Sequence, residues 1–122
     1  MAEQHSTVTI GTNAESRATT LLVDHGYQIV ERNFRCEAGE LDIVARERAI
    51  LVFVEVRSRA DDDHGTAAET VAWRKQRQIA RVAEHYLAER DPDYEEIRFD
   101  VLSITGEDVE LIKDAFRLGD LR

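Results

Sequence analysis

The chain has 122 residues, of which 43% are hydrophobic and 34% charged, and its formal net charge is −9. This length is typical of one domain that buries roughly two-thirds of the surface of its unfolded chain. The negative charge excludes a protein coated all over with basic residues for nucleic acid, but it does not exclude a local basic surface. The single cysteine, Cys36, cannot form an internal disulfide, which is typical of a reducing compartment.

The N-terminal residues give no targeting signal. Residues 1–10 form a polar stretch without the apolar core of a signal peptide, so we expect a flexible tail there and a single domain over residues 11–122. No apolar run approaches the ~18 residues that a membrane span requires. The sequence therefore predicts a soluble protein of the cytoplasm that does not contact a membrane.

The first predicted helix begins at Thr12 or Asn13, both good N-caps, and ends at Gly26. Glu15 falls in its first turn, at a spacing that puts the carboxylate on or beside the buried stripe. An acidic residue at a helix N-terminus is ordinarily explained by the helix dipole. Glu15 alone therefore does not indicate a site.

Several segments have the alternating or continuously apolar pattern of β-strands. These predicted strands span residues 27–36, 40–46, 49–57, 96–105 and 109–112. A long helix is predicted over residues 67–89, with its apolar face at Val71, Ala72, Ile79, Val82, Ala83, Tyr86 and Leu87. We expect a final helical turn after Lys113, with Ala115 and Phe116 covering the sheet.

Charged residues interrupt two neighbouring strands. Glu55 and Arg57 end an apolar run that belongs in the middle of a sheet, and Asp42 interrupts the preceding strand. Buried charges are costly unless they are paired or bind a ligand. A two-residue turn would put Asp42 and Glu55 on one face, directly opposite each other if the turn is Arg48-Ala49 and diagonal if it lies one residue earlier. A three-residue loop without a bulge would put them on opposite faces.

Two facing carboxylates repel unless a cation or a shared proton lies between them. Asp42 and Glu55 would offer oxygen ligands to Mg²⁺ or Mn²⁺, and such an ion can activate a water and stabilise charge on a phosphate. Glu15 could add an acid, and Arg57 could orient the water or the phosphate. This arrangement suits metal-dependent phosphodiester hydrolysis. The spacing also fits a structural cluster in which the two acids pair with Arg57 or Lys75.

Positive charge gathers near the long helix. Lys75 falls within or at the edge of its apolar stripe, where a lysine either extends to water or points at an acidic site. The acidity is mostly C-terminal, because residues 82–122 carry 12 acidic and 5 basic side chains. A local nucleic-acid-binding surface is therefore predicted at Arg57, Arg59, Arg74, Lys75 and Arg77.

Several segments resemble the YraN-like family of predicted endonucleases, which is related to the PD-(D/E)XK nucleases and to archaeal-type Holliday-junction resolvases. The two motifs that are specific together are Gly39-Glu40-Leu41-Asp42 and Val52-Phe53-Val54-Glu55-Val56-Arg57-Ser58-Arg59, with Asp42 and Glu55 13 residues apart. Further matches lie at residues 11–15, 26–27, 31–34 and 98–101, and at Val71 and Lys75. The resemblance thus covers nearly all of residues 11–116.

The resemblance implies an α/β fold with a central mixed β-sheet flanked by helices, in a restriction-endonuclease-like core. It implies that Asp42 and Glu55 match the metal ligands and that Glu15 is the acid of the first helix. The implied activity is Mg²⁺- or Mn²⁺-dependent cleavage of DNA, on branched or single-stranded forms. A homodimer is also expected, because resolvase-like enzymes act as dimers and branched DNA would require two sites.

Arg57 departs from the family pattern, which has lysine at this position. An arginine can bind a phosphate through two hydrogen bonds, but it is a poor group for proton transfer. One hypothesis is an endonuclease in which Arg57 or Lys75 contacts the scissile phosphate. A second is a catalytically impaired module that keeps the nuclease fold and binds nucleic acid or a partner. A third is a structural domain with a satisfied ion cluster.

Overall fold

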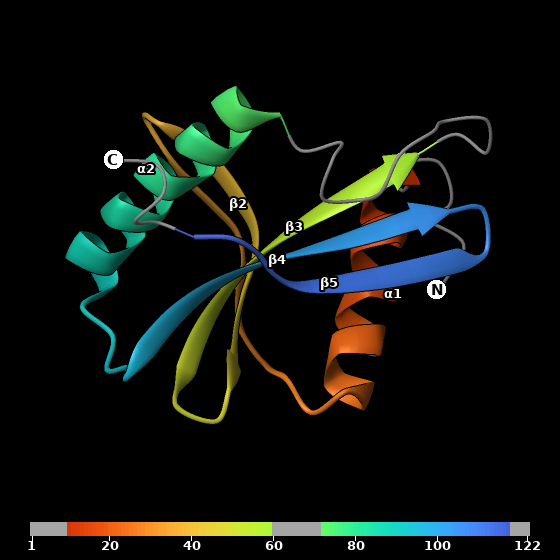
Figure 1. The fold of residues 1–122 in the computed structure, drawn as a ribbon, viewed down its shortest axis with the longest axis horizontal. Coiled ribbons are helices and arrows are strands. Elements are labelled where there is room, and N and C mark those ends of the chain that lie inside the picture. Colours follow the sequence, from red (N-terminus) through yellow and green to blue (C-terminus); the bar gives the residue numbers. More distant parts are fainter. Residues whose placement is uncertain (1–9, 60–71, 118–122) are drawn as a thin grey trace, which may run out of the picture.

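A computed structural model describes residues 10–59 and 72–117, and the side chains of residues 14–58 and 72–117. In these parts of the chain, two helices flank a five-stranded mixed β-sheet (Figure 1). The elements are α1 (Ile10–Asp24), β1 (Gln28–Cys36), β2 (Gly39–Glu47), β3 (Ile50–Arg59), α2 (Trp73–Arg90), β4 (Glu96–Thr105) and β5 (Asp108–Phe116). The α/β fold expected from the sequence is confirmed. Neither described helix combines the length and apolar character needed to cross a membrane.

The strands lie in the sheet in their chain order, β1-β2-β3-β4-β5. All neighbouring pairs are antiparallel except β3 and β4, which are parallel. A parallel pair needs a long crossover, and the segment that contains α2 supplies it. The turn between β2 and β3 consists of Arg48 and Ala49, and Arg48 adopts a φ of 59° there.

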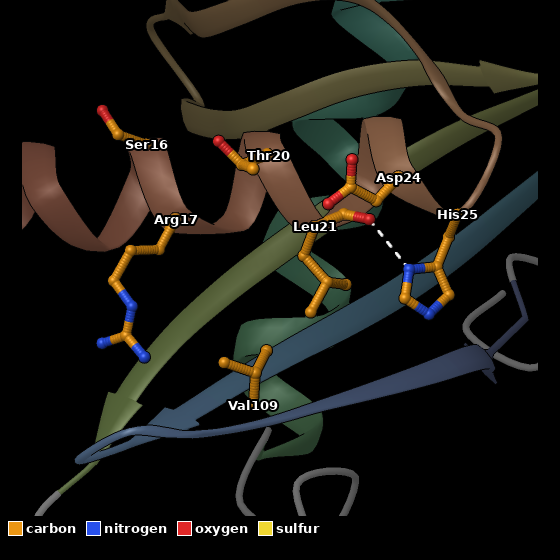
Figure 2. Close-up of a pocket in the computed structure, with 7 residues that line it drawn as sticks. All are labelled: Ser16, Arg17, Thr20, Leu21, Asp24, His25 and Val109. Atoms are coloured by element: carbon orange, nitrogen blue, oxygen red, sulfur yellow. Dashed lines mark hydrogen bonds between the residues drawn. The ribbon is translucent and has the colours of Figure 1, made fainter.

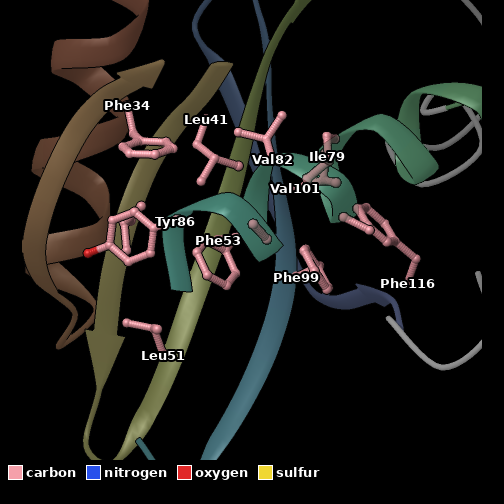
Figure 3. Packing of buried hydrophobic residues seen from close by; sticks show 13 residues of the cluster. Phe34, Leu41, Leu51, Phe53, Ile79, Val82, Tyr86, Phe99, Val101 and Phe116 are labelled. Carbon is pink, nitrogen blue, oxygen red and sulfur yellow. The ribbon is translucent and has the colours of Figure 1, made fainter. Parts of the chain in front are cut away.

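The helices cover opposite faces of the sheet, α1 on one and α2 on the other (Figure 1). Under α2, aromatic rings fill the core: Phe53 lies 5.7 Å from Tyr86 and 5.6 Å from Phe99 between ring centroids (Figure 3). Under α1, Ala18 and Leu22 are buried against the other face. Full burial of a large apolar side chain stabilises a fold by roughly 1.5–3 kcal/mol, so both faces contribute to the stability of the sheet.

A buried ion cluster ties β4 to the chain around it. Asp100 has no exposed surface, and its carboxylate accepts hydrogen bonds from the Tyr27 hydroxyl at 2.7 Å and from Arg98 Nε at 2.9 Å. The backbone N–H of Asp114 donates a third bond at 2.9 Å, and Arg98 also pairs with Glu47 at 2.9 Å. Burial and the neighbouring Asp100 raise the pKa of Tyr27. This acid is fully compensated by its partners.

The two helices do not begin where the sequence predicted. Helix α1 begins at Ile10, within the predicted tail, so Glu15 lies in its second turn; residues 1–9 lie outside the described part. Ala72 has extended backbone (ψ 151°), and α2 begins at Trp73; the predicted helical residues 67–71 lie outside the described part.

The sequence predicted a helical turn after Lys113. This prediction is wrong for the residues up to Phe116, because β5 continues to that residue. Two contacts with β4 hold this end of β5, where Asp114 adopts a φ of 57° at a shift in the register of the two strands. The Asp114 N–H donates to Asp100, and the Phe116 ring stacks on Phe99 with centroids 4.9 Å apart. The prediction that Phe116 covers the sheet is confirmed.

Candidate functional site

The predicted site lies where strands β2 and β3 part. The hairpin pairs Glu47 with Ile50 and continues to Ile43 and Val54, so the next pair in this register is Asp42 and Glu55. The two-residue turn therefore places the carboxyl groups directly opposite each other, as the parity argument predicted for a turn at Arg48-Ala49.

The backbone ladder between the two strands ends one residue before this pair, at Ile43 and Val54. Asp42 Oδ2 accepts a hydrogen bond of 2.8 Å from the backbone N–H of Val56. The Asp42 side chain thus satisfies a donor of β3 that a β2 carbonyl would otherwise bind. This bond fixes the orientation of Asp42 beside Glu55.

The two acids are largely buried, and their negative charges interact. Burial, followed by the charge of Asp42, raises the pKa of Glu55 from 4.5 to about 7. Burial also raises the pKa of Asp42, although the hydrogen bond from Val56 opposes that rise. The two carboxyl groups share a hydrogen bond that raises the pKa of Glu55 and lowers that of Asp42. The pair of carboxyl groups therefore keeps a proton to a higher pH than an isolated carboxyl would.

Two cations lie beside Glu55. Lys75 Nζ, from α2, is 3.8 Å from Glu55 Oε2, and the Glu55 side chain is only 12% exposed. Arg57 is partly buried on β3, two residues after Glu55. The charges of both cations lower the pKa of Glu55, but they do not outweigh burial and Asp42. The structure thus brings Lys75 to the acid pair, one of the two arrangements that its place in the helical stripe left open.

Further acids surround the pair. The charges of Glu15, from α1, and of Glu40, from β2, raise the pKa of Asp42. Glu15 Oε1 also lies 3.5 Å from the guanidinium of Arg32 on β1. The predicted acid of the first helix therefore acts on the site electrostatically, and it is itself partly neutralised.

The other predicted basic residues lie along the start of α2. Arg74 and Arg77 are exposed, and the Arg77 guanidinium covers the ring of Trp73 at 4.7 Å from its centroid. The backbone of Arg59 ends β3 opposite Thr105, but its side chain lies outside the described residues. Arg74 and Arg77 therefore lie within two residues of Lys75 in the sequence of α2 and are exposed.

The donor set suits a hard divalent cation. Across residues 10–59 and 72–117, no group of three or more His, Cys, Asp or Glu side chains could hold a metal. Mg²⁺ is commonly bound by one or two carboxylates, with waters and substrate phosphates as its remaining ligands. Asp42 and Glu55 fit that pattern, because a cation would replace the shared proton and remove the repulsion between them.

Sequence reasoning missed four contributors to the site. Glu40 belongs to the same motif as Asp42, so its spacing gave a signal that was not used. The pairing of Arg32 with Glu15 and the bond from Val56 join segments whose proximity no local pattern reveals. Gly39, with a φ of 142°, allows α2 to approach β2, because a Cβ there would lie 2.8 Å from Gln78 Nε2.

A groove of about 460 Å³ lies elsewhere, between α1 and β5 (Figure 2). Its polar side chains serve local structure. His25 Nδ1 lies 2.9 Å from the carbonyl oxygen of Leu21, and Arg17 donates to the carbonyl of Gly106 at 3.0 Å. The groove contains no facing acid pair, so we place the candidate site at the hairpin.

The fold and the hairpin define a class: an α/β protein with two facing buried carboxyl groups in its sheet. Residues 14–104 match the model of the uncharacterised protein family UPF0102, and the chain belongs to that family. The YraN-like resemblance is thereby confirmed at the level of the family.

Relatives in this family match the chain over most of its length. A UPF0102 protein of Lachnoclostridium phytofermentans is 45% identical over 107 residues, which cover 87% of this chain and 91% of that protein. A UPF0102 protein of Dechloromonas aromatica is 44% identical over 115 residues, covering 94% of each chain. A third, of Persephonella marina, is 40% identical over 108 residues, covering 88% of this chain and 93% of that protein.

Proposed function

We propose that this protein is a Mg²⁺- or Mn²⁺-dependent endonuclease that hydrolyses phosphodiester bonds in branched or single-stranded DNA. The observation that carries the proposal is the facing pair of buried carboxyl groups, Asp42 and Glu55, with raised pKa values. The motif resemblance to PD-(D/E)XK nucleases supports the same assignment.

The electrostatics favour a functional site over a structural cluster. Asp100 shows how this fold compensates a buried acid, with four hydrogen bonds from three residues to one carboxylate. At Asp42 and Glu55, two acids face each other, and the Lys75 ammonium lies at 3.8 Å rather than at hydrogen-bond distance. Strongly raised pKa values of this kind cluster at functional sites.

The residues would divide the work as follows. Asp42 and Glu55 hold the cation, and the Val56 N–H keeps Asp42 in place. A bound Mg²⁺ or Mn²⁺ supplies charge stabilisation at the phosphate and lowers the pKa of water. Arg57 and Lys75 bind the scissile phosphate, and Glu15 adds negative charge to the cation site.

Lys75 can compensate for the arginine at position 57. The family pattern places a lysine where this chain has Arg57, and arginine cannot give up a proton near neutral pH. Lys75 reaches the same carboxylate from α2, at 3.8 Å from Glu55 Oε2. We therefore assign the positioning of water to Lys75, in addition to its contact with the phosphate, whereas Arg57 binds phosphate oxygens only.

A second candidate function follows from the same substitution. If Lys75 does not replace the missing lysine, the chain is a catalytically impaired module that binds nucleic acid or a protein partner through the same surface. A homodimer is proposed for either function, because it would offer two sites to a branched DNA.

A cleavage panel tests the proposal. Linear, single-stranded, flap and four-way DNA are incubated with wild type in Mg²⁺ and in Mn²⁺, with Glu55→Gln as the inactive variant and Glu110→Gln as an exposed-acid control. We expect cleavage by wild type and the control, and none by Glu55→Gln. If no substrate is cut but Arg57→Lys cuts one, the impaired module is correct. If neither wild type nor Arg57→Lys cuts a substrate, and titrations show that neither binds DNA or metal, the endonuclease and the nucleic-acid-binding module are both refuted.

A further inference from the structure

We propose that Trp73 and Arg77 form a stacking platform for an unpaired nucleobase, which would make single-stranded segments of nucleic acid the preferred ligand. This inference rests on the proposed function and adds to it the class of substrate that the site accepts. It concerns the first turns of α2, outside the acid pair.

Trp73 is the most exposed large apolar side chain in the described part of the molecule, with 59% of its surface accessible. Its ring does not contribute to either core cluster. The Arg77 guanidinium covers the ring at 4.7 Å from its centroid, which uses the i, i+4 spacing on the helix. The ring is thus held by a cation and still offers a large open surface.

The positive charges around the Trp73 ring favour a nucleic acid as its ligand. Arg74 and Arg77 are exposed beside it, and Lys75 lies one residue beyond Arg74. Binding surfaces for single strands combine cations that contact the backbone with aromatic rings on which bases stack. A base paired within a duplex has its faces covered by its neighbours, so only an unpaired base can use the open face of Trp73.

The platform lies within reach of the acid pair. Trp73 and Lys75 are two residues apart, which puts them roughly 200° apart around a helix about 10 Å across. Lys75 points to Glu55 at 3.8 Å, and Trp73 lies on the other side of the same turn. A strand whose base stacks on Trp73 would need only a few nucleotides to bring a phosphate to Lys75.

The chain carries its own probe, because Trp73 is its single tryptophan. The full chain, in EDTA so that no cleavage occurs, is titrated with an oligothymidylate of about 16 nucleotides and with a blunt duplex of equal length. We expect saturable quenching of tryptophan fluorescence by the single strand and weaker binding of the duplex. Anisotropy of labelled DNA then measures affinity for the variants.

Trp73→Ala should weaken single-strand binding roughly five- to a hundredfold, the range for one lost base–aromatic stack. Trp73→Phe keeps a ring and should restore most of the affinity. The control is Tyr94→Ala, which removes another exposed aromatic, 43% accessible, among Asp91, Asp93, Glu95 and Glu96. It should change affinity by less than about twofold.

The inference is overturned if the single strand leaves the fluorescence unchanged while it binds, if the duplex binds as tightly, or if Trp73→Ala and Tyr94→Ala have equal effects. Binding of a protein partner alone would also overturn it. These outcomes are separate from those of the cleavage panel. Cleavage without quenching refutes only the platform, and quenching without metal-dependent cleavage refutes only the endonuclease.

Discussion

Glu55→Gln tests whether the acid pair is held at a cost to stability. The substitution removes the charge, keeps the size of the side chain and leaves an amide that can donate to Asp42. Because burial and the charge of Asp42 disfavour ionised Glu55, we expect the variant to be more stable than wild type at alkaline pH in the absence of metal. Most substitutions destabilise, so the direction is itself informative.

The magnitude follows from the pKa of Glu55, which rises from 4.5 to about 7. The unfolded chain loses this proton near its usual pKa, whereas the folded chain keeps it until about pH 7. Stability that is present below the unfolded pKa is therefore lost as the pH rises through the folded pKa. At about 1.36 kcal/mol per pKa unit, the loss amounts to about 3 kcal/mol. Solvent screens the charge of Glu55 only slightly, because the Glu55 side chain is 12% exposed.

Urea unfolding at about pH 5 and about pH 8, without metal, measures this difference. With a slope of roughly 1–3 kcal/mol per molar urea, the midpoint of Glu55→Gln should exceed that of wild type by about 1–3 M at the higher pH. The gain should be well under half as large at the lower pH, because that pH lies only slightly above the unfolded pKa of 4.5 and little of the stability has yet been lost.

Glu47→Gln is the matched control, because the same substitution there should have the opposite sign. Hydrogen bonds from Lys113 and Arg98 lower the pKa of Glu47, so its charge stabilises the fold above the unfolded pKa and the stabilisation disappears as the pH falls. If Glu55→Gln loses stability at alkaline pH as Glu47→Gln does, Glu55 is a stabilising partner of Lys75 and the reasoning is refuted.

Three further predictions follow from the contacts. Asp100→Ala should lower the free energy of unfolding by about 3–5 kcal/mol in urea, since it removes one member of a buried ion cluster; a loss below about 1 kcal/mol would contradict the network. Gly39→Ala, at a φ of 142° and with Gln78 Nε2 2.8 Å from the new Cβ, should cost roughly 1–3 kcal/mol in the same assay. Lys75→Gln should raise the pKa of Glu55, which an NMR titration measures, because the positive charge of Lys75 lowers that pKa in wild type. The same substitution should reduce the salt dependence of DNA binding by about one charge. If neither the pKa nor the salt dependence changes, Lys75 has no role at the site.

The hairpin could be predicted because its determinants are local. A two-residue turn and the alternation of side chains fix which residues face each other, so Asp42 and Glu55 followed from their distances to Arg48 and Ala49. The apolar spacing of α2 likewise predicted the burial of Ile79.

The errors concern contacts between distant segments. Lys113 and Asp114 look like turn residues in the sequence, yet the Asp114 N–H binds Asp100 and the strand continues. Such a bond depends on the sheet already being formed. The start of α2 was misplaced in the same way, because an apolar pattern does not mark where extended backbone ends.

Parts of the site also could not be predicted from local sequence patterns. The sequence allowed Lys75 either to extend into water or to point at an acid, and only packing of α2 on the sheet brings it to 3.8 Å from Glu55. The pKa of Glu55 depends on burial, which no spacing gives. The spacing of Trp73 and Arg77 is visible in the sequence, but the exposure of the Trp73 ring depends on how α2 packs, which no local pattern gives. The role of Arg59 stays a prediction.

Calorimetric titration of Mn²⁺ into the full chain tests the central claim most directly. We expect binding at a single site in wild type, with release of protons that grows as the pH is lowered toward the pKa of Glu55, about 7. Asp42→Ala and Glu55→Gln should abolish the binding, and Glu110→Gln should leave it unchanged. Absence of binding to wild type, or equal binding by Glu55→Gln, would contradict a cation site at Asp42 and Glu55.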